Sequence, residues 1–348
     1  MTEVQFDRYP FVGQLPSARA WIVFQANLQR SPQTVDAYAR DLQDYLAFCQ
    51  QHQLAAETAQ KEHIALYVRD MAERPRPRGR NGSVLVSGTG LANATMQRRL
   101  TAVRLYYDSL VEDGTCLRNP VGRGRYTPGK GFAGTRDHAL LRRYTKLPWI
   151  PTEDQWQAIL EATRREPPRN RFMFALAYDA GLRREELCRL ATTDIEPGKR
   201  LIHIRAETTK NQKARVVPYS EPTADLYAAY LVERRRLSRA RGPLFLSESR
   251  RNRSQPLSKW MWSKIIHQIA EQAAVPQFTP HTLRHLCLTD LARAGWDQRE
   301  IAEFAGHTSI ETTRLYIRLS GRDLAKKLDA GMASIHAWRA RVMKEVLA

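Results

Sequence analysis

Residues 278–295 read FTPHTLRHLCLTDLARAG, a stretch that predicts a helix with several polar side chains on one face. Thr279 suits the position before the helix, and Pro280 suits the first helical position, where its missing N–H costs nothing. Residues three and four apart are neighbours on a helix, so His281, Arg284 and His285 should share a face. An imidazole that moves a proton and a guanidinium that holds charge together suit a phosphate.

The same pattern allows a metal site as an alternative. His281 and His285 have the spacing of a pair of zinc ligands on a helix. The glutamate of an HExxH helix is missing, however, and Arg284 lies between the two histidines. We therefore expect no metal at this helix.

A second candidate segment, residues 174–195, reads FALAYDAGLRREELCRLATTDI. Gly181 is expected to end one helix in the left-handed conformation, with the next helix starting near Arg183. An arginine at such a fixed corner presents its planar fork to two phosphate oxygens, and Glu186, one turn further on, is expected to hold it. A surface salt bridge between Arg183 and Glu186 is the alternative interpretation.

A third segment, residues 304–318, reads FAGHTSIETTRLYIR. Thr308 and Glu311 form a capping-box pattern, so a helix should begin just after His307 and carry Tyr316 two turns in. On one straight helix His307 and Tyr316 would lie more than about 10 Å apart. They can therefore meet only through tertiary folding or across a protomer interface.

The overall charge indicates the kind of partner. The chain has 348 residues, a formal net charge of +19 and a pI near 10.1. Such an excess of positive charge attracts polyanions, so nucleic acid is the expected partner, the alternative being an unrelated enzyme with a basic surface.

There is no apolar run of the roughly 18 residues that a membrane span needs and no secretory signal in the first thirty residues, so we expect a soluble, cytoplasmic protein. Four cysteines without a CxxC pair are expected to be reduced: Cys49, Cys116, Cys188 and Cys287.

The length suggests two domains. Residues 31–52, SPQTVDAYARDLQDYLAFCQQH, predict an amphipathic helix with Ser31 as N-cap, and a further helix is expected over residues 94–110. The Arg-, Pro- and Gly-rich residues 73–93 predict a loop that either touches phosphates or is a solvated insertion. Residues 119–150 carry seven basic residues and one acidic residue, which indicates a linker suited to a DNA backbone. We therefore expect a helical domain over 1–118, a basic linker over 119–150 and a second domain over 151–348.

A short hairpin is expected in the second domain, where residues 200–220 read RLIHIRAETTKNQKARVVPYS. Residues 201–204 and 216–217 look like two strands around a polar turn. Lys210, at the turn, has a flexible stem that can carry an ammonium into a DNA groove. Lys213 and Arg215 compete for that role.

Taken together, the motifs resemble the tyrosine recombinase (phage integrase) family. GLRREEL, TKNQKARVVP, HTLRH and then AGH, with Tyr316 nine residues after its histidine, occur in the family's order. The resemblance is strong over residues 151–318. SPQTVDAYARDL and NATMQRRLTAVRLYYDSL resemble the family's helical core-binding domain more weakly. The implied fold is mainly α: a helical, SAM-like N-terminal core-binding domain and a mostly helical catalytic domain with a small antiparallel β-sheet.

The resemblance also implies a role for each candidate residue. Arg183 and Arg284 would clamp the phosphate, Lys210 would be the general acid, His281 would assist proton transfer, His307 would bind the phosphate, Tyr316 would be the nucleophile and Glu186 would be the supporting acid. This chain has Thr209 and Asn211 where the family often has glycines, which keeps Lys213 as a reserve for Lys210, and Ala305 where leucine is usual.

The implied reaction is cleavage and rejoining of DNA through a 3′-phosphotyrosine and a Holliday junction, without ATP, metal or cofactor. The implied partners are double-stranded DNA with a specific recombination site, a homodimer on each site and a homotetramer in the synapse, with no membrane. A helical tail over residues 323–348 would pack on a neighbouring protomer or on its own domain. The alternatives are a type IB topoisomerase and a catalytically silent DNA-binding regulator; HTLRH and the small first domain favour a recombinase.

Overall fold

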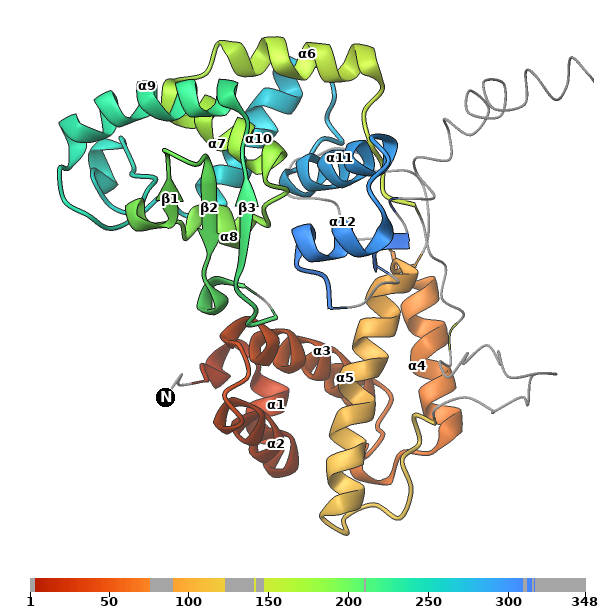
Figure 1. Ribbon diagram of the computed structural model, residues 1–348. Coiled ribbons are helices and arrows are strands. Elements are labelled where there is room, and N and C mark those ends of the chain that lie inside the picture. Colours follow the sequence, from red (N-terminus) through yellow and green to blue (C-terminus); the bar gives the residue numbers. More distant parts are fainter. Residues whose placement is uncertain are drawn as a thin grey trace, which may run out of the picture. The chain divides into compact units, whose positions relative to one another are not determined.

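The computed structural model describes residues 4–75, 90–122, 141, 147–209, 211–308, 312–314 and 316 (Figure 1). The chain divides into two compact units, residues 1–145 and 146–348. Both are mainly helical, and the second also contains a small antiparallel sheet, as the sequence predicts.

The first unit is a helical bundle around one apolar core. Its longest described helices, α3 (Pro32–Gln51) and α5 (Asn93–Glu112), pack against each other. The other elements are η1 (Phe6–Arg8), α1 (Pro10–Gln14), α2 (Pro16–Asn27), η2 (Ala56–Thr58) and α4 (Lys61–Glu73).

The start of α3 agrees with the sequence prediction. The Ser31 side chain accepts a hydrogen bond from the backbone N–H of Thr34, and Pro32 occupies the first helical position. The predicted helix over residues 94–110 is also confirmed, as α5. In the core between α3 and α5 the hydroxyls of Tyr45 and Tyr107 lie 2.6 Å apart, and Tyr107 also donates to the carbonyl of Ala56. Two buried hydroxyls thus satisfy each other and a backbone carbonyl.

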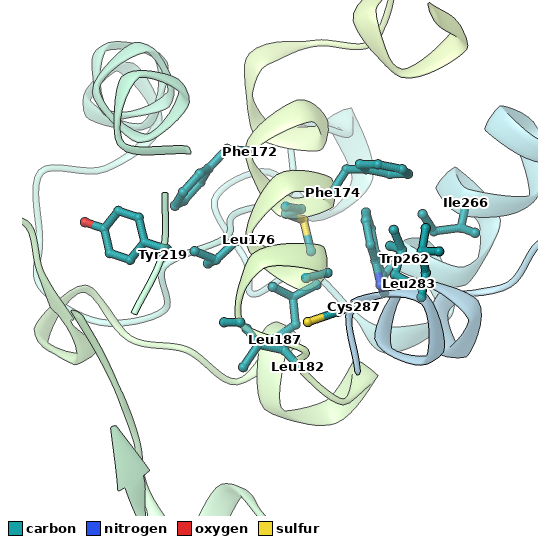
Figure 2. Packing of buried hydrophobic residues seen from close by; sticks show 14 of the residues in the cluster. Phe172, Phe174, Leu176, Leu182, Leu187, Tyr219, Trp262, Ile266, Leu283 and Cys287 are labelled. Carbon is teal, nitrogen blue, oxygen red and sulfur yellow. The ribbon is translucent and has the colours of Figure 1, made fainter. Parts of the chain in front are cut away.

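The second unit is built around helix α7 (Pro168–Asp179). It contacts α6 (Glu153–Arg164), α8 (Arg184–Cys188), α9 (Glu221–Leu237) and α11 (Pro280–Arg293), while α10 (Lys259–Gln272) packs on α6, α8 and α11. Figure 2 shows Phe172, Phe174 and Leu176 of this helix among the buried side chains of its neighbours. The remaining described elements are α12 (Gln298–Ala305) and the one-turn helices η3 (Thr192–Asp194), η4 (Ala206–Thr208) and η5 (Arg250–Asn252).

The sheet has the order β1-β2-β3, with β1 (Ile195–Glu196), β2 (Leu201–Ile204) and β3 (Arg215–Pro218) all antiparallel. The β2–β3 pairing, with Ile202 opposite Val217, confirms the expected hairpin, whereas the two-residue β1 was not predicted. Alternate residues of a strand face opposite sides. Val217 is therefore buried while Val216 is exposed.

Several sequence predictions lie outside the described residues. They concern Lys210, residues 309–311 of the expected capping box, the tail over 323–348, and most of 73–93 and 119–150. The four cysteines carry free thiols, as expected. Within the described ranges, the helices are too short or too polar to cross a membrane, and His, Cys, Asp and Glu side chains form no cluster suited to a metal ion.

Candidate active site

Two left-handed glycines shape the backbone of the candidate site. Gly181, with φ +54°, follows α7 and turns the chain towards Arg183, which precedes α8. Gly306, with φ +62°, ends α12 just before His307. A residue with a Cβ is strained at such angles, so glycine at both turns has a conformational reason.

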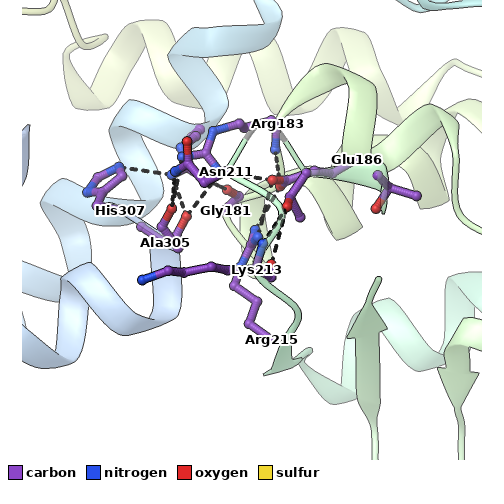
Figure 3. Close-up of polar contacts among 12 residues, drawn as sticks. Gly181, Arg183, Glu186, Asn211, Lys213, Arg215, Ala305 and His307 are labelled. Atoms are coloured by element: carbon purple, nitrogen blue, oxygen red, sulfur yellow. Dashed lines mark hydrogen bonds and ion pairs between the residues drawn. The ribbon is translucent and has the colours of Figure 1, made fainter. Parts of the chain in front are cut away.

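Arg183 lies at the corner that the sequence predicts. Its Nη1 is 2.8 Å from Glu186 Oε1, and Glu186 also accepts the backbone N–H of Arg183 at 3.0 Å. The guanidinium donates further to the carbonyls of Ala305 (3.4 Å) and Gly306 (3.2 Å) (Figure 3). The expected support of Arg183 by Glu186 is thus present, and the two carbonyls at the end of α12 also accept hydrogen bonds from its guanidinium.

Arg284, on α11, converges on the same turn. It donates to the carbonyls of Gly181 (2.5 Å) and Ala305 (2.7 Å), and its Nη2 lies 2.9 Å from His307 Nε2. The side chain is buried. Burial, and then the nearby positive charge of Arg183, lower the pKa of Arg284 to about 10, so it remains a cation at neutral pH.

Glu186 is the buried anion that balances these cations. It binds Arg215 of β3 as well as Arg183. Burial alone would raise the pKa of Glu186, but the hydrogen bonds and charges of Arg215 and Arg183 outweigh it and lower the pKa to about 2. Glu186 is therefore a carboxylate at any physiological pH.

His307 has a defined partner on each ring nitrogen. Nε2 faces Arg284, and Nδ1 lies 2.9 Å from Thr313 Oγ1. Burial first, and then Arg284, Arg183 and Arg215, lower the pKa of His307 to about 3. The imidazole is therefore neutral in the free protein.

Tyr316 packs directly against this imidazole. The two ring centroids lie 5.9 Å apart with planes inclined by only 10°, and the phenolic oxygen is 3.0 Å from His285 Nδ1. Burial raises the pKa of Tyr316, while Arg284 and Arg183 lower it in part, so the phenol is protonated at neutral pH. His307 and Tyr316, which would be too far apart on one straight helix, are thus brought into contact by tertiary folding within a single chain.

His281 lies in the first turn of α11 with an exposed side chain. Partial desolvation, and then the charges of Arg184, Arg284 and Arg183, lower its pKa. The field of these arginines therefore reaches His281.

Four further residues of the site were missed or misread from the sequence. Arg215 was considered as a competitor of Lys210, but its guanidinium is buried on Glu186 and donates to the carbonyl of Phe304 at 2.9 Å, so it is a structural cation. Its position two residues from buried Val217 in β3 was a usable signal, because such residues share a face. The others are Asn211, which donates to the Gly306 carbonyl at 3.2 Å, His285 and Thr313.

Two guanidinium groups, a neutral imidazole and a buried phenol are therefore gathered around one turn. The cations suit an oxyanion on which negative charge develops, and a phenol with a raised pKa needs such a setting to become a nucleophile. This arrangement of side chains suits attack by the phenolic oxygen on a phosphate.

Comparisons with known proteins agree with this description. The profile described as Phage integrase family matches residues 151–322, and the profile described as Phage integrase, N-terminal SAM-like domain, matches residues 23–114. The chain belongs to the phage integrase family, the tyrosine recombinases that cleave and rejoin DNA strands, which confirms the resemblance found in the sequence.

Curated relatives carry a more specific name. Tyrosine recombinase XerC of Pelobacter propionicus is 29% identical over 315 residues, which cover 89% of this chain and 92% of the relative. Tyrosine recombinase XerC of Mycobacterium tuberculosis is 29% identical over 296 residues, covering 84% and 89%.

Solved structures share the fold. The XerH site-specific recombinase in a post-cleavage complex with palindromic difH substrate has a TM-score of 0.64 at 17% identity, covering 93% of this chain and 87% of that one. The Tn1549 transposon integrase in complex with transposon right end DNA has a TM-score of 0.60 at 15% identity, covering 85% and 92%.

Proposed function

We propose that this chain is a site-specific recombinase that cuts double-stranded DNA by forming a covalent bond between Tyr316 and a strand 3′-phosphate. The observation that carries the proposal is the stacking of the Tyr316 phenol on His307, whose imidazole is bound in turn by Arg284. The phenol that we propose as nucleophile therefore contacts a side chain of the group that we propose to surround the phosphate.

In the proposed cleavage step the phenolic oxygen attacks phosphorus, the Tyr316 O–P bond forms and the bond to the 5′-oxygen breaks. Arg183 and Arg284 stabilise the negative charge that develops on the non-bridging oxygens, and His307 borders the same position. The phenolic proton leaves to the adjacent His285 Nδ1 or to water, and Lys210 protonates the 5′-oxygen as it leaves, with His281 assisting. Glu186 keeps Arg183 oriented.

Rejoining reverses this step on a partner strand. The free 5′-hydroxyl attacks the phosphotyrosine link, so bond energy is conserved and ATP is not required. Exchange of one strand pair and then the other passes through a Holliday junction, which requires a homodimer on each of two sites and a homotetramer in the synapse.

The proposed DNA contact involves both units. We assign residues 1–118 and 151–348 as two DNA-binding domains joined by the basic linker 119–150, acting on DNA in the cytoplasm. The net charge of +19 supports this, as do the DNA complexes of the XerH and Tn1549 relatives. Because counterions are released from DNA, the logarithm of affinity should fall linearly with the logarithm of salt concentration.

The test is covalent trapping on a nicked duplex taken from the DNA that flanks this gene. Wild type should form an adduct that survives a denaturing gel, and Tyr316→Phe should form none. Tyr219→Phe is the matched control, because Tyr219 is also buried and its hydroxyl lacks a hydrogen-bond partner among the described residues. Tight binding without an adduct would favour the DNA-binding regulator, whereas relaxation of supercoils without joining of two sites would favour the topoisomerase.

The general acid is tested separately, on a duplex with sulfur in place of the bridging 5′-oxygen. A thiolate leaves without a proton, so this substrate should restore cleavage by Lys210→Ala but not by Tyr316→Phe. If it restores Lys213→Ala instead, the acid is Lys213.

A further inference from the structure

Thr313 is a fully buried polar side chain beside the candidate site. Its hydroxyl lies 2.9 Å from His307 Nδ1. It precedes Tyr316 by three residues, which on a helix is the spacing of neighbours on one face. The same short segment therefore carries both a partner of the histidine and the candidate nucleophile.

The hydrogen bonds of His307 define its tautomer. Arginine has donors but no acceptor, so Arg284 Nη2 must donate and His307 Nε2 must accept. A neutral imidazole then carries its hydrogen on Nδ1 and donates it to Thr313 Oγ1. Turning the ring by 180° would set carbon atoms against both partners and lose both hydrogen bonds.

The charged surroundings agree with this assignment. Arg284 of α11, Arg183 before α8 and Arg215 of β3 all disfavour a proton on His307, whereas Glu186 favours one. Since Nε2 faces the arginines, Nδ1 is the nitrogen that can keep a hydrogen, provided that an acceptor stands beside it.

We propose that Thr313 is a positioning residue for the strand-transfer reaction. It accepts the Nδ1 hydrogen of His307, holds the ring in one tautomer with Nε2 towards the arginines, and links the histidine to the segment of Tyr316 so that the two keep their stacked arrangement. This role rests on the proposed function, because it matters for catalysis only if Tyr316 and His307 act on a phosphate.

The test compares Thr313→Val, which keeps the shape of the side chain and removes the hydroxyl, with Thr313→Ser, which keeps the hydroxyl. Three quantities are measured: the rate of adduct formation on the nicked duplex as a function of pH, the DNA affinity, and the tautomer of His307 in the free protein by ¹⁵N NMR of the imidazoles. Thr163→Val is the matched control, since Thr163 is a buried helical threonine that donates to the carbonyl of Ile159.

Loss of one buried hydrogen bond typically costs a factor of about ten. We therefore expect Thr313→Val to slow adduct formation about tenfold with unchanged DNA affinity, to alter the pH profile of cleavage and to mix the tautomers of His307. Thr313→Ser should restore the rate and the single Nδ1–H tautomer, and Thr163→Val should change neither.

The proposal is overturned if Thr313→Val leaves the His307 tautomer and the pH profile as in wild type, whether or not the rate falls. It is also overturned if Thr313→Ser is as slow as Thr313→Val, because a hydroxyl would then be insufficient. Failure of the proposed function gives a different result: wild type itself forms no adduct, while the NMR comparison still decides whether Thr313 fixes the tautomer.

Discussion

Glu186 and Arg215, which are 29 residues apart in the sequence, form a two-point ion pair, with Nη2–Oε2 at 2.7 Å and Nη1–Oε1 at 3.2 Å. The same carboxylate binds the side chain and the backbone N–H of Arg183. It therefore joins β3 to the start of α8, and this junction sets the position of Arg183 in the site.

Glu186→Gln should destabilise the second unit strongly. Removing the charge leaves the buried Arg215 and the half-buried Arg183 without their counter-ion, and an uncompensated buried charge typically costs about 3–5 kcal/mol. Urea denaturation measures the loss. Glu185→Gln is the control, because Glu185 pairs with Lys259 near the surface and such pairs contribute about 1 kcal/mol or less. Equal effects of the two variants would contradict the central role of Glu186.

Acidification should destabilise the protein from about pH 6.5 downwards. Burial lowers the pKa of His307 to about 3 and that of His285 to about 4, so both stay neutral in the folded state at pH values where the unfolded chain, with a pKa near 6.5, binds protons. Their stabilising contribution is complete above the unfolded pKa and is lost as pH falls towards the folded values.

The slope of the unfolding free energy between pH 7 and pH 5 measures this effect. Each histidine contributes at most about 1.4 kcal/mol per pH unit, and less here because solvent screens half-buried groups. His307→Gln should flatten the slope, because it removes one of the two histidines that the fold keeps neutral. A slope unchanged in His307→Gln would mean that this histidine is not held neutral by the fold.

Gly181→Ala should destabilise the second unit and reduce cleavage. The left-handed φ costs a residue with a Cβ about 1–2 kcal/mol, and the new methyl would lie 3.2 Å from the Phe304 ring. Because the Gly181 carbonyl also holds Arg284, adduct formation should slow as well. Thermal unfolding and adduct assays measure the two effects. Gly198→Ala is the control, since its added Cβ meets nothing within 4 Å. If Gly181→Ala left both the unfolding temperature and the rate of adduct formation unchanged, strain at this turn would be excluded.

Tyr107→Phe should destabilise the first unit without touching the candidate site. The change removes the hydrogen bonds of Tyr107 to Tyr45 and to the Ala56 carbonyl, and unsatisfied buried groups cost about 1–3 kcal/mol. Hydrogen exchange of α3 and α5 amides reports the loss locally. Tyr38→Phe is the control, because the Tyr38 ring is half-buried and stacks on Trp21, and it should change amide hydrogen exchange much less. Similar exchange rates in the two variants would rule out the hydroxyl pair as a source of stability.

Local features of the fold and of this site could be predicted from the sequence. Gly181 and the i, i+3 pair of Arg183 and Glu186 depend on neighbours in the chain, as do the starts of α3 and α11, where proline follows a cap residue. These patterns reflect backbone sterics and hydrogen bonds within a turn.

The rest of the site depends on long-range packing. The pairing of Arg215 with Glu186 and the contact of His285 with Tyr316 join elements 29 and 31 residues apart, and no local period encodes either. The pattern of residues 278–295 puts His281 and His285 on one face, but it does not reveal that His285 meets the phenol while His281 faces solvent. The two-residue β1 gives too short a pattern to detect.

Arg183 and Arg284 are held largely by main-chain oxygens, those of Gly181, Ala305 and Gly306. Every amino acid supplies the same carbonyl, so this part of the support depends on the path of the backbone, to which Glu186 and His307 add side-chain contacts. A change of side chain at Ala305 would therefore leave its carbonyl contacts in place, whereas any other residue at Gly306, whose φ is +62°, would strain the turn that presents these carbonyls.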